Sequence, residues 1–562
     1  MSEDRRTQIR SVFGLLLCIT IAILEVGCKL GSFADLNTNG NTNGNSNGNG
    51  NSNSSLVFST PEDVSNSHSN LRSAWPIESN VILDDVGSLH VLYEETDSIG
   101  SDRQIKYVTK TSGGSWSTPV QLSAAASSMG SIASFSARMD VHPTNGHVYA
   151  VWTRASLSSA VYMVHNRSGS FTAETQISDT NTPPNLNFAP GVRVDGGDNA
   201  HFVWTGQPSG RNVVYYRGLF DGTLDTAQTA VSSLTEDSWI EPSGLAVIPP
   251  ADGAQVVSVA YVGSTPVHLW YAERPAGKGQ SFGTPIDISK DSQSTHELGS
   301  IDASPRLLFD GTGDLRVLWT HMYASGSVSA DIWGNPRAAS GSFKDTSDNL
   351  TRASQGSSSS VTAPIDLGGR LAVDSSGCLH LFWEYNPGTG TDEYYHRYFS
   401  PIAVDPSTVV SALLGTTTTL FQTHGIRTAL DSFDALHVAW EQEDSNAART
   451  IYYQKRSAGS GGSFESSATQ LSVTSLDSAL KSAAASGGGR FFAIFDKGDV
   501  PNAHVVTREV NGSVRGPLNL SESIGAQSQG LIVRVDSAGT AHVLWISTFN
   551  STQRDIYYSS GT

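Results

Sequence analysis

The sequence predicts an all-β chain folded as a single β-propeller of four-stranded antiparallel blades, and three observations predict it. A pattern Asp-x-x-Gly-x-x-His-x-x-Trp recurs along the chain, for example at residues 374–383. Each copy is followed by the same order of short segments rich in β-forming residues. No amphipathic helical pattern of useful length separates the copies. Self-similarity at a fixed period is typical of propellers and other repeat folds.

The copies repeat about every 56 residues. Two gaps are about twice as long, and each contains a degenerate unit without the Asp and His, at residues 243–271 and 483–507. The copy at residues 140–152 is longer than the others because of an insertion. Nine units, forming eight or nine blades, are therefore expected. The plain copies begin at Asp84, Asp140, Asp195, Asp310, Asp374, Asp431 and Asp536.

Each unit is predicted to contain four strands. In the unit that begins at residue 369, residues 370–374 and 379–383 alternate in polarity on either side of a turn, which predicts a hairpin. A third strand follows at Tyr394-Tyr395. The fourth strand is clearest at residues 116–123 and 282–289, where an early proline suits an edge strand.

The two ends of the chain predict how the array closes. The last unit stops after its third strand, whereas residues 58–65 have the fourth-strand pattern and no unit of their own. We expect this N-terminal strand to complete the C-terminal blade, which would remove the exposed edges of a linear stack.

The repeated Asp, His and Trp are expected to be structural, because a unique active site would not be repeated. If the His lies opposite the Asp in the hairpin, Arg370 faces Glu384, Arg427 faces Glu441 and Arg306 faces Thr320. The Trp lies on the other strand face and is expected to pack between neighbouring blades. In the alternative, some Trp or Tyr side chains are exposed platforms for sugar stacking.

Arginines just upstream of the Asp are the candidate ligand-binding residues. All of them share one face of the innermost strand, where guanidinium groups could bind a carboxylate or a sulfate. The alternative is structural pairing, with Glu384 and Glu441 as partners. Three arginines lie two residues before the Asp and three lie four residues before it: Arg138, Arg193 and Arg534, and Arg306, Arg370 and Arg427.

The blade pattern resembles the sialidase-like, Asp-box (BNR) propeller superfamily over nearly all of residues 56–562. The turns at residues 111–116 and 168–171 keep the Gly and the aromatic residue of the Asp-box but lack its Asp. The resemblance implies a propeller, although sialidases have six blades. It also implies that Arg306, Arg370 and Arg427 could imitate the arginine triad of sialidases. The Phe/Tyr-Arg-Ile-Pro segment and the Tyr-Glu pair of sialidases are not found here, so no catalytic residue is predicted.

The first 55 residues are predicted to be an export signal and a tether. Arg5, Arg6 and Arg10 precede an apolar run at residues 12–24, which is too short for a comfortable membrane span. Leu24-Glu25-Val-Gly27-Cys28 resembles a bacterial lipobox, from which Glu25 departs. We expect a signal peptide at 1–28 with lipidation at Cys28, a disordered tether at 29–55 and the propeller at 56–562. Cleavage without lipidation, or an uncleaved anchor, is the alternative.

Composition and motifs reduce the number of possible functions. The net charge of −18 disfavours nucleic acid and anionic membrane surfaces as partners, so the membrane is reached through the anchor alone. No metal or cofactor motif is found, and the Asp195 and Asp310 segments are interpreted as turns. The predicted function is a binding module for a glycan or a protein, displayed at the cell surface or outer membrane; the alternatives are a secreted or periplasmic location and a sialidase-like hydrolase. Glu94, Glu95, Glu384 and Glu441 could supply the two carboxylates of a glycosidase.

Replacing Cys28 by Ser tests the anchor. Without the acylated thiol, the protein is expected to move from the membrane to the soluble fraction on cell fractionation, because the tether has no apolar surface to retain it. A Cys28→Ser protein that stays in the membrane fraction would show that the lipobox prediction is wrong.

Overall fold

The computed structural model describes most of the chain after residue 55. The signal peptide, Cys28 and the tether lie outside the described residues, as do Asp310 and Arg370. No helix within the described part has the length and hydrophobicity to cross a membrane. The described ranges are 56–65, 73–96, 103–124, 133–155, 159–179, 187–208, 210–248, 255–264, 267–289, 301–309, 314–322, 330–337, 341–344, 347–350, 360–361, 371–386, 393–399, 412–416, 425–443, 449–459, 462–472, 478–497, 501–524, 527–550 and 553–562.

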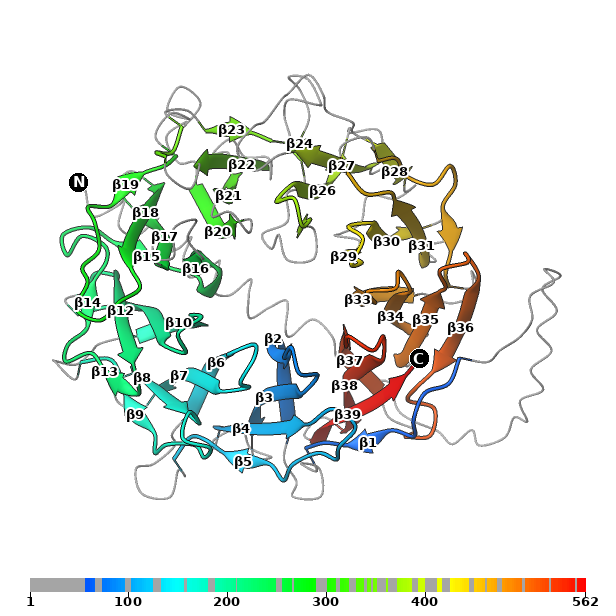
Figure 1. Cartoon of the computed structure of the whole chain (residues 1–562), viewed down its shortest axis with the longest axis horizontal. Helices are drawn as coiled ribbons and strands as arrows, with labels where there is room; N and C mark the ends of the chain where they lie inside the picture. Colours follow the sequence, from blue (N-terminus) through cyan, green and yellow to red (C-terminus); the bar gives the residue numbers. More distant parts are fainter. Residues whose placement is uncertain are drawn as a thin grey trace. The chain divides into compact units, whose positions relative to one another are not determined.

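The described strands form antiparallel units that follow one another in chain order (Figure 1). Units 1, 2 and 9 are joined into one sheet by two single parallel pairs, Ser73 with Arg554 and Arg103 with Ala133. Unit 1 contains β2 (Ser73–Leu83), β3 (Leu89–Thr96), β4 (Arg103–Lys110) and β5 (Val120–Gln121); unit 2 contains β6 (Ala133–Val141), β7 (Val148–Ala155), β8 (Ser159–His165) and β9 (Thr175–Gln176). Unit 3 contains β10 (Asn187–Val194), β11 (Ala200–Gly206), β12 (Val213–Phe220), β13 (Thr223–Leu224) and β14 (Thr229–Ala230).

The middle units have the same order of strands. Unit 4 contains β15 (Ser238–Trp239), the 3₁₀ turn η2 (Pro242–Gly244), β16 (Leu245–Ile248), β17 (Val256–Ser264), β18 (Val267–Pro275) and β19 (Ile286–Asp287). Unit 5 contains β20 (Ile301–Phe309), β21 (Leu315–Met322), β22 (Ala330–Arg337) and β23 (Asp348–Asn349). Unit 6 contains β24 (Ser360–Val361), β25 (Leu371–Val373), β26 (Leu379–Asn386), β27 (Glu393–Phe399) and β28 (Ala412–Thr416).

The last three units complete the array. Both degenerate units predicted from the sequence are present, as units 4 and 8. Unit 7 contains β29 (Ile426–Leu430), β30 (Leu436–Glu443), β31 (Arg449–Arg456) and β32 (Thr469–Gln470); unit 8 contains β33 (Ser478–Ala485), β34 (Phe491–Lys497), β35 (Asn502–Arg508) and β36 (Val514–Asn519); unit 9 contains β37 (Gln527–Val535), β38 (Ala541–Asn550), β39 (Gln553–Gly561) and, from the N-terminus, β1 (Glu62–Asp63).

The repeated Asp begins the turn between the first and second strands. One carboxylate oxygen of Asp431 accepts the backbone N–H groups of Phe433 and Ala435, both at 2.9 Å. Three residues after the Asp, the backbone has a positive φ, +75° at Gly377 and +59° at Asp434. Glycine is common at this position because it adopts a positive φ without steric cost.

The predicted register of this hairpin is wrong by two residues. The turn extends from the Asp to the fourth residue after it, so the His faces the residue two before the Asp, as His542 faces Arg534. Arg427 therefore pairs with Ala439 and not with Glu441, and Arg306 pairs with Leu318 and not with Thr320. The Arg370–Glu384 pair lies outside the described side chains.

A buried chain of hydrogen bonds joins Asp, His and a third-strand Tyr. In unit 7, Nε2 of His437 lies 3.2 Å from the Asp431 carboxylate and Nδ1 lies 2.9 Å from the Tyr453 hydroxyl. Burial lowers the pKa of His437 to about 4, so the ring is neutral; Nε2–H donates to the carboxylate and Nδ1 accepts from the hydroxyl. Units 1, 3 and 9 contain the same chain, through His90, His201 and His542.

The unit predicted to start at Asp140 starts two residues later. His142 occupies the first turn position, since its N–H bonds the carbonyl of His147. Asp140 lies on β6, and its carboxylate accepts the N–H of Val194 in unit 3 at 2.8 Å. The sequence pattern did not reveal this shift. Asp140 and His142 are two residues apart, so both would lie on the same face of a strand.

The repeated Trp packs between units, as predicted. Trp204 of unit 3 is fully buried in a cluster with Tyr149, Val151 and Val161 of unit 2. Trp152, Trp319, Trp440 and Trp545 are equally buried against the preceding unit. These five side chains therefore offer no surface for sugar stacking.

A second contact between units involves the third-strand Tyr. The aromatic ring of the next unit's outer turn packs edge-on against it, as Phe282 does on Tyr216 with 5.2 Å between ring centroids. A cation of the next unit lies over the same ring, with the guanidinium carbon of Arg274 at 4.7 Å from its centroid. Arg337 on Tyr271 and Arg508 on Tyr453 repeat this arrangement.

The N-terminal strand pairs with the last strand, as predicted. In β1, Glu62 is opposite Tyr558 and Asp63 is opposite Tyr557. The hydroxyl oxygen of Ser65 accepts the N–H of Ile556 at 3.0 Å. In units whose fourth strand comes from the same stretch of chain, a serine at this position accepts an equivalent bond. In unit 1, for example, the Ser123 hydroxyl accepts the N–H of Ile105 at 3.0 Å. The N-terminal segment is thus the fourth strand of unit 9.

Replacing His396 by Tyr tests the hydrogen-bond chain. In unit 6, His396 stands where other units have Tyr, and its Nε2 lies 3.1 Å from Nδ1 of His380. Burial lowers the pKa of both rings, that of His380 to about 3. Because each pKa is lower in the folded than in the unfolded protein, stability is lost as the pH falls below about 6.5, by about 1.4 kcal/mol per pH unit for each His.

His396→Tyr is therefore expected to raise the urea midpoint of unfolding and to reduce its fall between pH 6.5 and pH 4. The Tyr hydroxyl would donate to Nδ1 of His380, and one protonatable ring would be removed. Urea titrations at four pH values, followed by tryptophan fluorescence, measure both effects. An unchanged pH dependence would contradict the neutral, buried state of His396.

Candidate functional site

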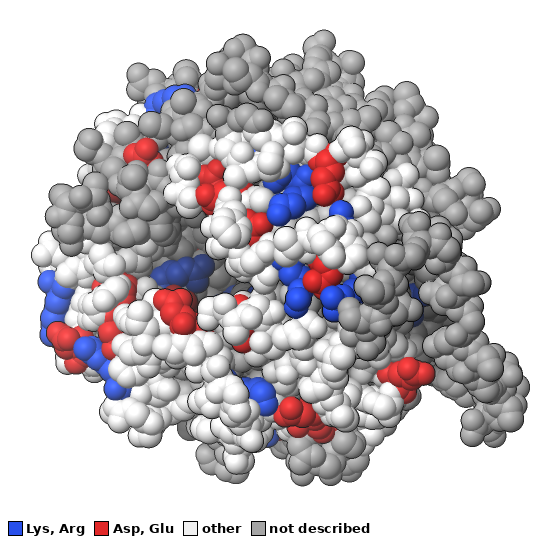
Figure 2. Space-filling model, turned by 45° about the vertical axis from the view of Figure 1, so that its right-hand side comes forward, with Lys and Arg blue, Asp and Glu red and all other residues white. Residues whose placement is uncertain are grey.

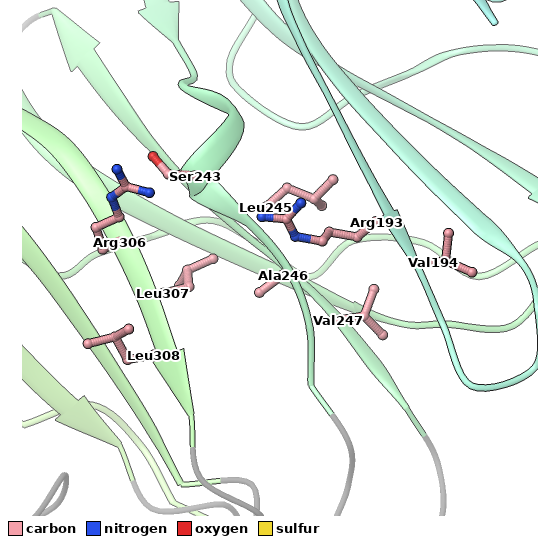
Figure 3. A pocket seen from close by; sticks show the side chains of 9 residues that line it. All are labelled: Arg193, Val194, Ser243, Leu245, Ala246, Val247, Arg306, Leu307 and Leu308. Atoms are coloured by element: carbon pink, nitrogen blue, oxygen red, sulfur yellow. The ribbon is translucent and has the colours of Figure 1, made fainter. Parts of the chain in front are cut away.

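Two of the candidate arginines lie at one cavity. Arg193 of β10 and Arg306 of β20 line a cavity of about 300 Å³ together with Ser243 of η2 (Figure 3). In this view, both guanidinium groups face the side where η2 lies. The other described residues that line the cavity are apolar: Val194, Leu245, Ala246, Val247, Leu307 and Leu308. The cavity thus lies between the first strands of units 3, 4 and 5.

The cavity exists because the first strand of unit 4 is broken. In unit 3, β10 is continuous apart from a bulge between Phe188 and Gly191. In unit 4, β15 ends at Trp239 and β16 begins at Leu245, and both pair with β17. The residues between them form η2, so the strand leaves the sheet plane at this point. The degenerate unit therefore departs from the repeat where the two arginines meet.

Contacts to both neighbours hold the turn in place. The N–H of Ile240 donates to the Thr205 hydroxyl in unit 3 at 3.0 Å, and the Ser243 hydroxyl donates to the Pro305 carbonyl in unit 5 at 3.0 Å. A Cβ at Gly244 would lie 2.2 Å from the Ala260 carbonyl oxygen, so only glycine fits there. Pro242 begins the turn, where its fixed φ is favourable. The cavity wall is therefore rigidly built.

The two arginines differ in exposure and in their neighbours. Arg193 is exposed and donates to the Val192 carbonyl at 3.1 Å. Asp140 is near it: burial raises the pKa of Asp140, and the charge of Arg193 opposes this shift. Arg306 is half-buried.

Three other candidate arginines donate to backbone carbonyls. Arg427 donates to the Lys481 carbonyl of unit 8 at 2.7 Å and to the Ile426 carbonyl at 2.9 Å. Arg534 donates to the Val533 carbonyl at 2.9 Å. Arg138 donates to the Ala137 carbonyl, and burial lowers its pKa while the charge of Glu94 raises it. None of the three lines the cavity.

The candidate glutamate Glu441 joins two units. One carboxylate oxygen accepts the N–H of Leu480 on the first strand of unit 8 at 2.6 Å. Glu94, at the same position of unit 1, accepts N–H groups of Ser136 and Ala137 on β6. Burial raises the pKa of Glu94, and Arg103 and these bonds oppose the rise. In units 1 and 7 this position therefore contacts the first strand of the next unit.

Sequence reasoning identified Arg193 and Arg306 but not the residues between them. Ser243 and residues 245–247 carry no motif, and they lie in a unit recognised only as degenerate. The degeneracy itself was the usable signal, because a site unique in a repeat array must break the repeat. No group of three or more His, Cys, Asp or Glu suited to a metal ion is found in the described part of the chain.

Comparisons with known proteins give distant likenesses. No protein-family model matches the chain, and no curated protein matches it. It is similar to an ulvan lyase of family PL25 (9% identity over 79% of this chain and 96% of that chain, TM-score 0.33) and to the GH93 α-L-arabinofuranosidase of Fusarium graminearum (11%, 60% and 93%, 0.30). It is also similar to the α-L-arabinanase of Penicillium chrysogenum (12%, 57% and 93%, 0.28). At these TM-scores the likenesses carry no argument about function.

Substitutions at Glu441 test its assignment to the scaffold. Glu441→Ala leaves the buried N–H of Leu480 without its acceptor, which is expected to cost about 1–3 kcal/mol of stability. Glu441→Gln keeps an acceptor oxygen and should cost less. Chemical unfolding of both variants gives the comparison. Equal destabilisation by Ala and Gln would show that the charge, and not the hydrogen bond, matters.

Proposed function

We propose that this protein is a surface-displayed binding module that holds a glycan or protein ligand at the cavity between units 3, 4 and 5. The observation that carries the proposal is the break in the repeat at η2, which places Arg193, Ser243 and Arg306 around one cavity. Arg193 donates to the carbonyl of the preceding residue as Arg138 and Arg534 do, but of these three only Arg193 lines this cavity. A pocket of this size with few polar groups is typical of ligand sites.

Binding without hydrolysis is favoured by the lining of the cavity. Glycosidases generally need two carboxyl groups on either side of the scissile bond. The described residues that line the cavity include two arginines and a serine but no Asp, Glu or Tyr. Two of the four glutamates that could have supplied carboxylates, Glu94 and Glu441, accept backbone N–H groups of the next unit. The hydrolase alternative therefore has no support from this cavity.

The proposed scaffold is a closed propeller of nine blades. Lys110 and Trp116 of unit 1 contact Tyr558 of unit 9 as Arg274 and Phe282 contact Tyr216 between units 3 and 4. The ammonium nitrogen lies 5.1 Å from the Tyr558 ring centroid, and the Trp116 ring packs edge-on at 5.2 Å. A shared hydrophobic cluster also joins units 9 and 1. These contacts support closure because they repeat an internal junction at the chain ends.

Export and lipid anchoring at Cys28 are part of the proposal. The basic residues, the apolar run and the lipobox-like segment support them, and residues 37–55 consist only of Asn, Thr, Ser and Gly. Such a flexible segment of 19 residues would hold the folded body roughly 25 Å from the membrane. The cavity would then face extracellular or periplasmic ligands.

The experiment uses the full-length protein in detergent on a glycan array and a peptide array, with a fluorogenic sialoside assay in parallel. Binding to an array component is expected, and Ala246→Leu should abolish it by filling the cavity while leaving the circular dichroism unchanged. Arg427→Gln, which changes an arginine outside the cavity, is the matched control. Sialoside hydrolysis that Arg306→Ala abolishes in a folded protein would overturn the binding-only function.

A further inference from the structure

Four strongly exposed apolar side chains belong to four successive units. Among the described residues, eight large hydrophobic side chains are exposed. Half of them lie in units 7, 8, 9 and 1, one in each unit, and we call these four the apolar arc. Scattered apolar residues are ordinary on a protein surface, whereas grouped ones indicate an interaction site. The members are Phe433 (71% exposed), Val510 (69%), Val57 (65%) and Val86 (60%).

Strand pairing places three members of the arc at the same end of their units. Val86 and Phe433 lie in the turn between the first and second strands, before β3 and β30 respectively. Val510 lies in the turn between the third and fourth strands, β35 and β36. In an antiparallel unit these two turns lie at one end; in unit 8, Phe491 at the start of β34 is opposite Arg508 at the end of β35. We call it the turn end.

The fourth member lies at the turn end because the N-terminal segment runs antiparallel to the last strand. Val57 precedes Phe58, which bridges to Gly561 at the end of β39. Gly561 is opposite Ala541, which follows the first turn of unit 9. Leu56 is buried in a cluster of units 8 and 9. The predicted tether, which ends at residue 55, therefore joins the folded chain at the turn end, within the apolar arc.

The four units that carry the arc pack against one another. Buried clusters join unit 7 to unit 8, unit 8 to unit 9 and unit 9 to unit 1. At the turn end, the Ser432 hydroxyl donates to the Gly487 carbonyl across the junction of units 7 and 8 at 2.6 Å. Figure 1 shows β1 beside β39, with unit 8 on one side and unit 1 on the other. The arc is therefore carried by one packed set of sheets.

The other four exposed apolar residues do not form such a group. Val120 and Ile286 lie on the edge strands β5 and β19 of units 1 and 4. Leu234 lies in the connection to β15, and Phe549 lies near the end of β38, both at the end opposite to the turns. Leu234 is 63% exposed and so provides a matched control for the arc.

The charged side chains beside the arc are paired within the protein. Nζ of Lys455 lies 3.2 Å from the Asp431 carboxylate, and Nε of Arg490 lies 3.0 Å from the Glu509 carboxylate. On the face drawn in Figure 2, basic and acidic side chains are interspersed. These pairs and the net charge of −18 disfavour an anionic lipid surface and favour a zwitterionic one.

The attachment point of the tether favours lipid over a protein partner as the surface that the arc meets. An anchor at Cys28 would keep the turn end nearest to the membrane, because the tether joins the folded chain within the arc. A flexible tether permits a range of distances, including contact, and it raises the effective concentration of the arc at the membrane. Burying exposed Val and Phe side chains at a lipid interface is favourable.

We propose that the apolar arc docks on the surface of a zwitterionic lipid bilayer, with its four side chains inserted among the lipid head groups. The inference rests on the anchoring that is part of the proposed function. The contact is additional to the anchor. It would orient the array, with the turn end toward the membrane and the opposite end toward the solvent.

Fluorescence quenching on the full-length, anchored protein tests the inference. Single cysteines are introduced as Val86→Cys, Phe433→Cys or Val510→Cys and labelled with an environment-sensitive dye. A Cys378→Ser background removes the free thiol of the described chain. In phosphatidylcholine vesicles that contain a nitroxide-labelled lipid, dyes at these positions are expected to be quenched. A dye at Leu234→Cys, at the opposite end, should not be quenched.

Removing one apolar side chain tests whether the arc holds the contact. With the dye at Val510→Cys, adding Phe433→Ser is expected to lower the ratio of docked to undocked protein about ten-fold, because burial of one large apolar side chain contributes at least that factor. Leu234→Ser is the matched control and should leave the quenching unchanged. Circular dichroism of each variant shows whether it is folded.

Flotation of the vesicles separates failure of the inference from failure of the anchoring. Protein that floats with the vesicles but shows no quenching at any arc position would reject the inference alone and leave the arc to a protein partner. Equal quenching at Leu234→Cys and Phe433→Cys would also reject it, because the array would then have no preferred orientation. Protein that does not float with the vesicles would reject both the anchoring and the docking.

Discussion

The hydrogen-bond chain from Asp through His to Tyr is the interaction on which the rest of the structure depends. In unit 7, Asp431 begins the turn, His437 lies on the second strand and Tyr453 lies on the third. One chain therefore fixes three strands of a unit against one another. Burial opposes ionisation of Asp431, but the N–H donors and His437 together lower its pKa, so the carboxylate stays charged inside the hairpin.

The same chain also connects neighbouring units. The Tyr that ends it receives an aromatic edge and a cation from the next unit, as Tyr216 does from Phe282 and Arg274. Units 4 and 8 thus pack on a Tyr whose orientation is already fixed by a hydrogen bond in the preceding unit. This explains how a chain whose described part contains one free cysteine and no disulfide holds its sheets in register. Packing between units replaces covalent links.

A site that is unique in such an array requires a departure from the repeat. Unit 4 lacks the Asp and His, and Ser258 and Tyr271 form a hydroxyl pair in their place at 2.8 Å. The first strand of unit 4 is interrupted at η2, and the cavity lies beside this interruption. Unit 8 is also degenerate, yet its first strand is continuous from Ser478 to Ala485. Degeneracy of the sequence pattern therefore does not by itself create such a site.

Some features of the fold followed from local pattern, and others did not. Strand order, the degenerate units, the buried Trp and the pairing of residues 58–65 with the last unit were predicted correctly, because two-residue alternation and turn residues carry this information locally. The pairing partners of Arg427 and Arg306 were predicted wrongly, because the register depends on how many residues the turn occupies. That number is set by the side-chain hydrogen bonds of the Asp, which the pattern does not show.

The sequence by itself determined the repeating unit, its strands and the residues that face inward, because each of these depends on neighbours within about a dozen positions. Which arginines meet was decided only by the tertiary structure. Arg193 and Arg306 are separated by a whole unit in the chain, and they share a cavity because the strand between them leaves the sheet at Pro242. Arg427, with the same local sequence context, donates instead to a carbonyl of the next unit. Arg306 and Arg427 both lie four residues before the repeated Asp. Their contacts differ because different units pack against them.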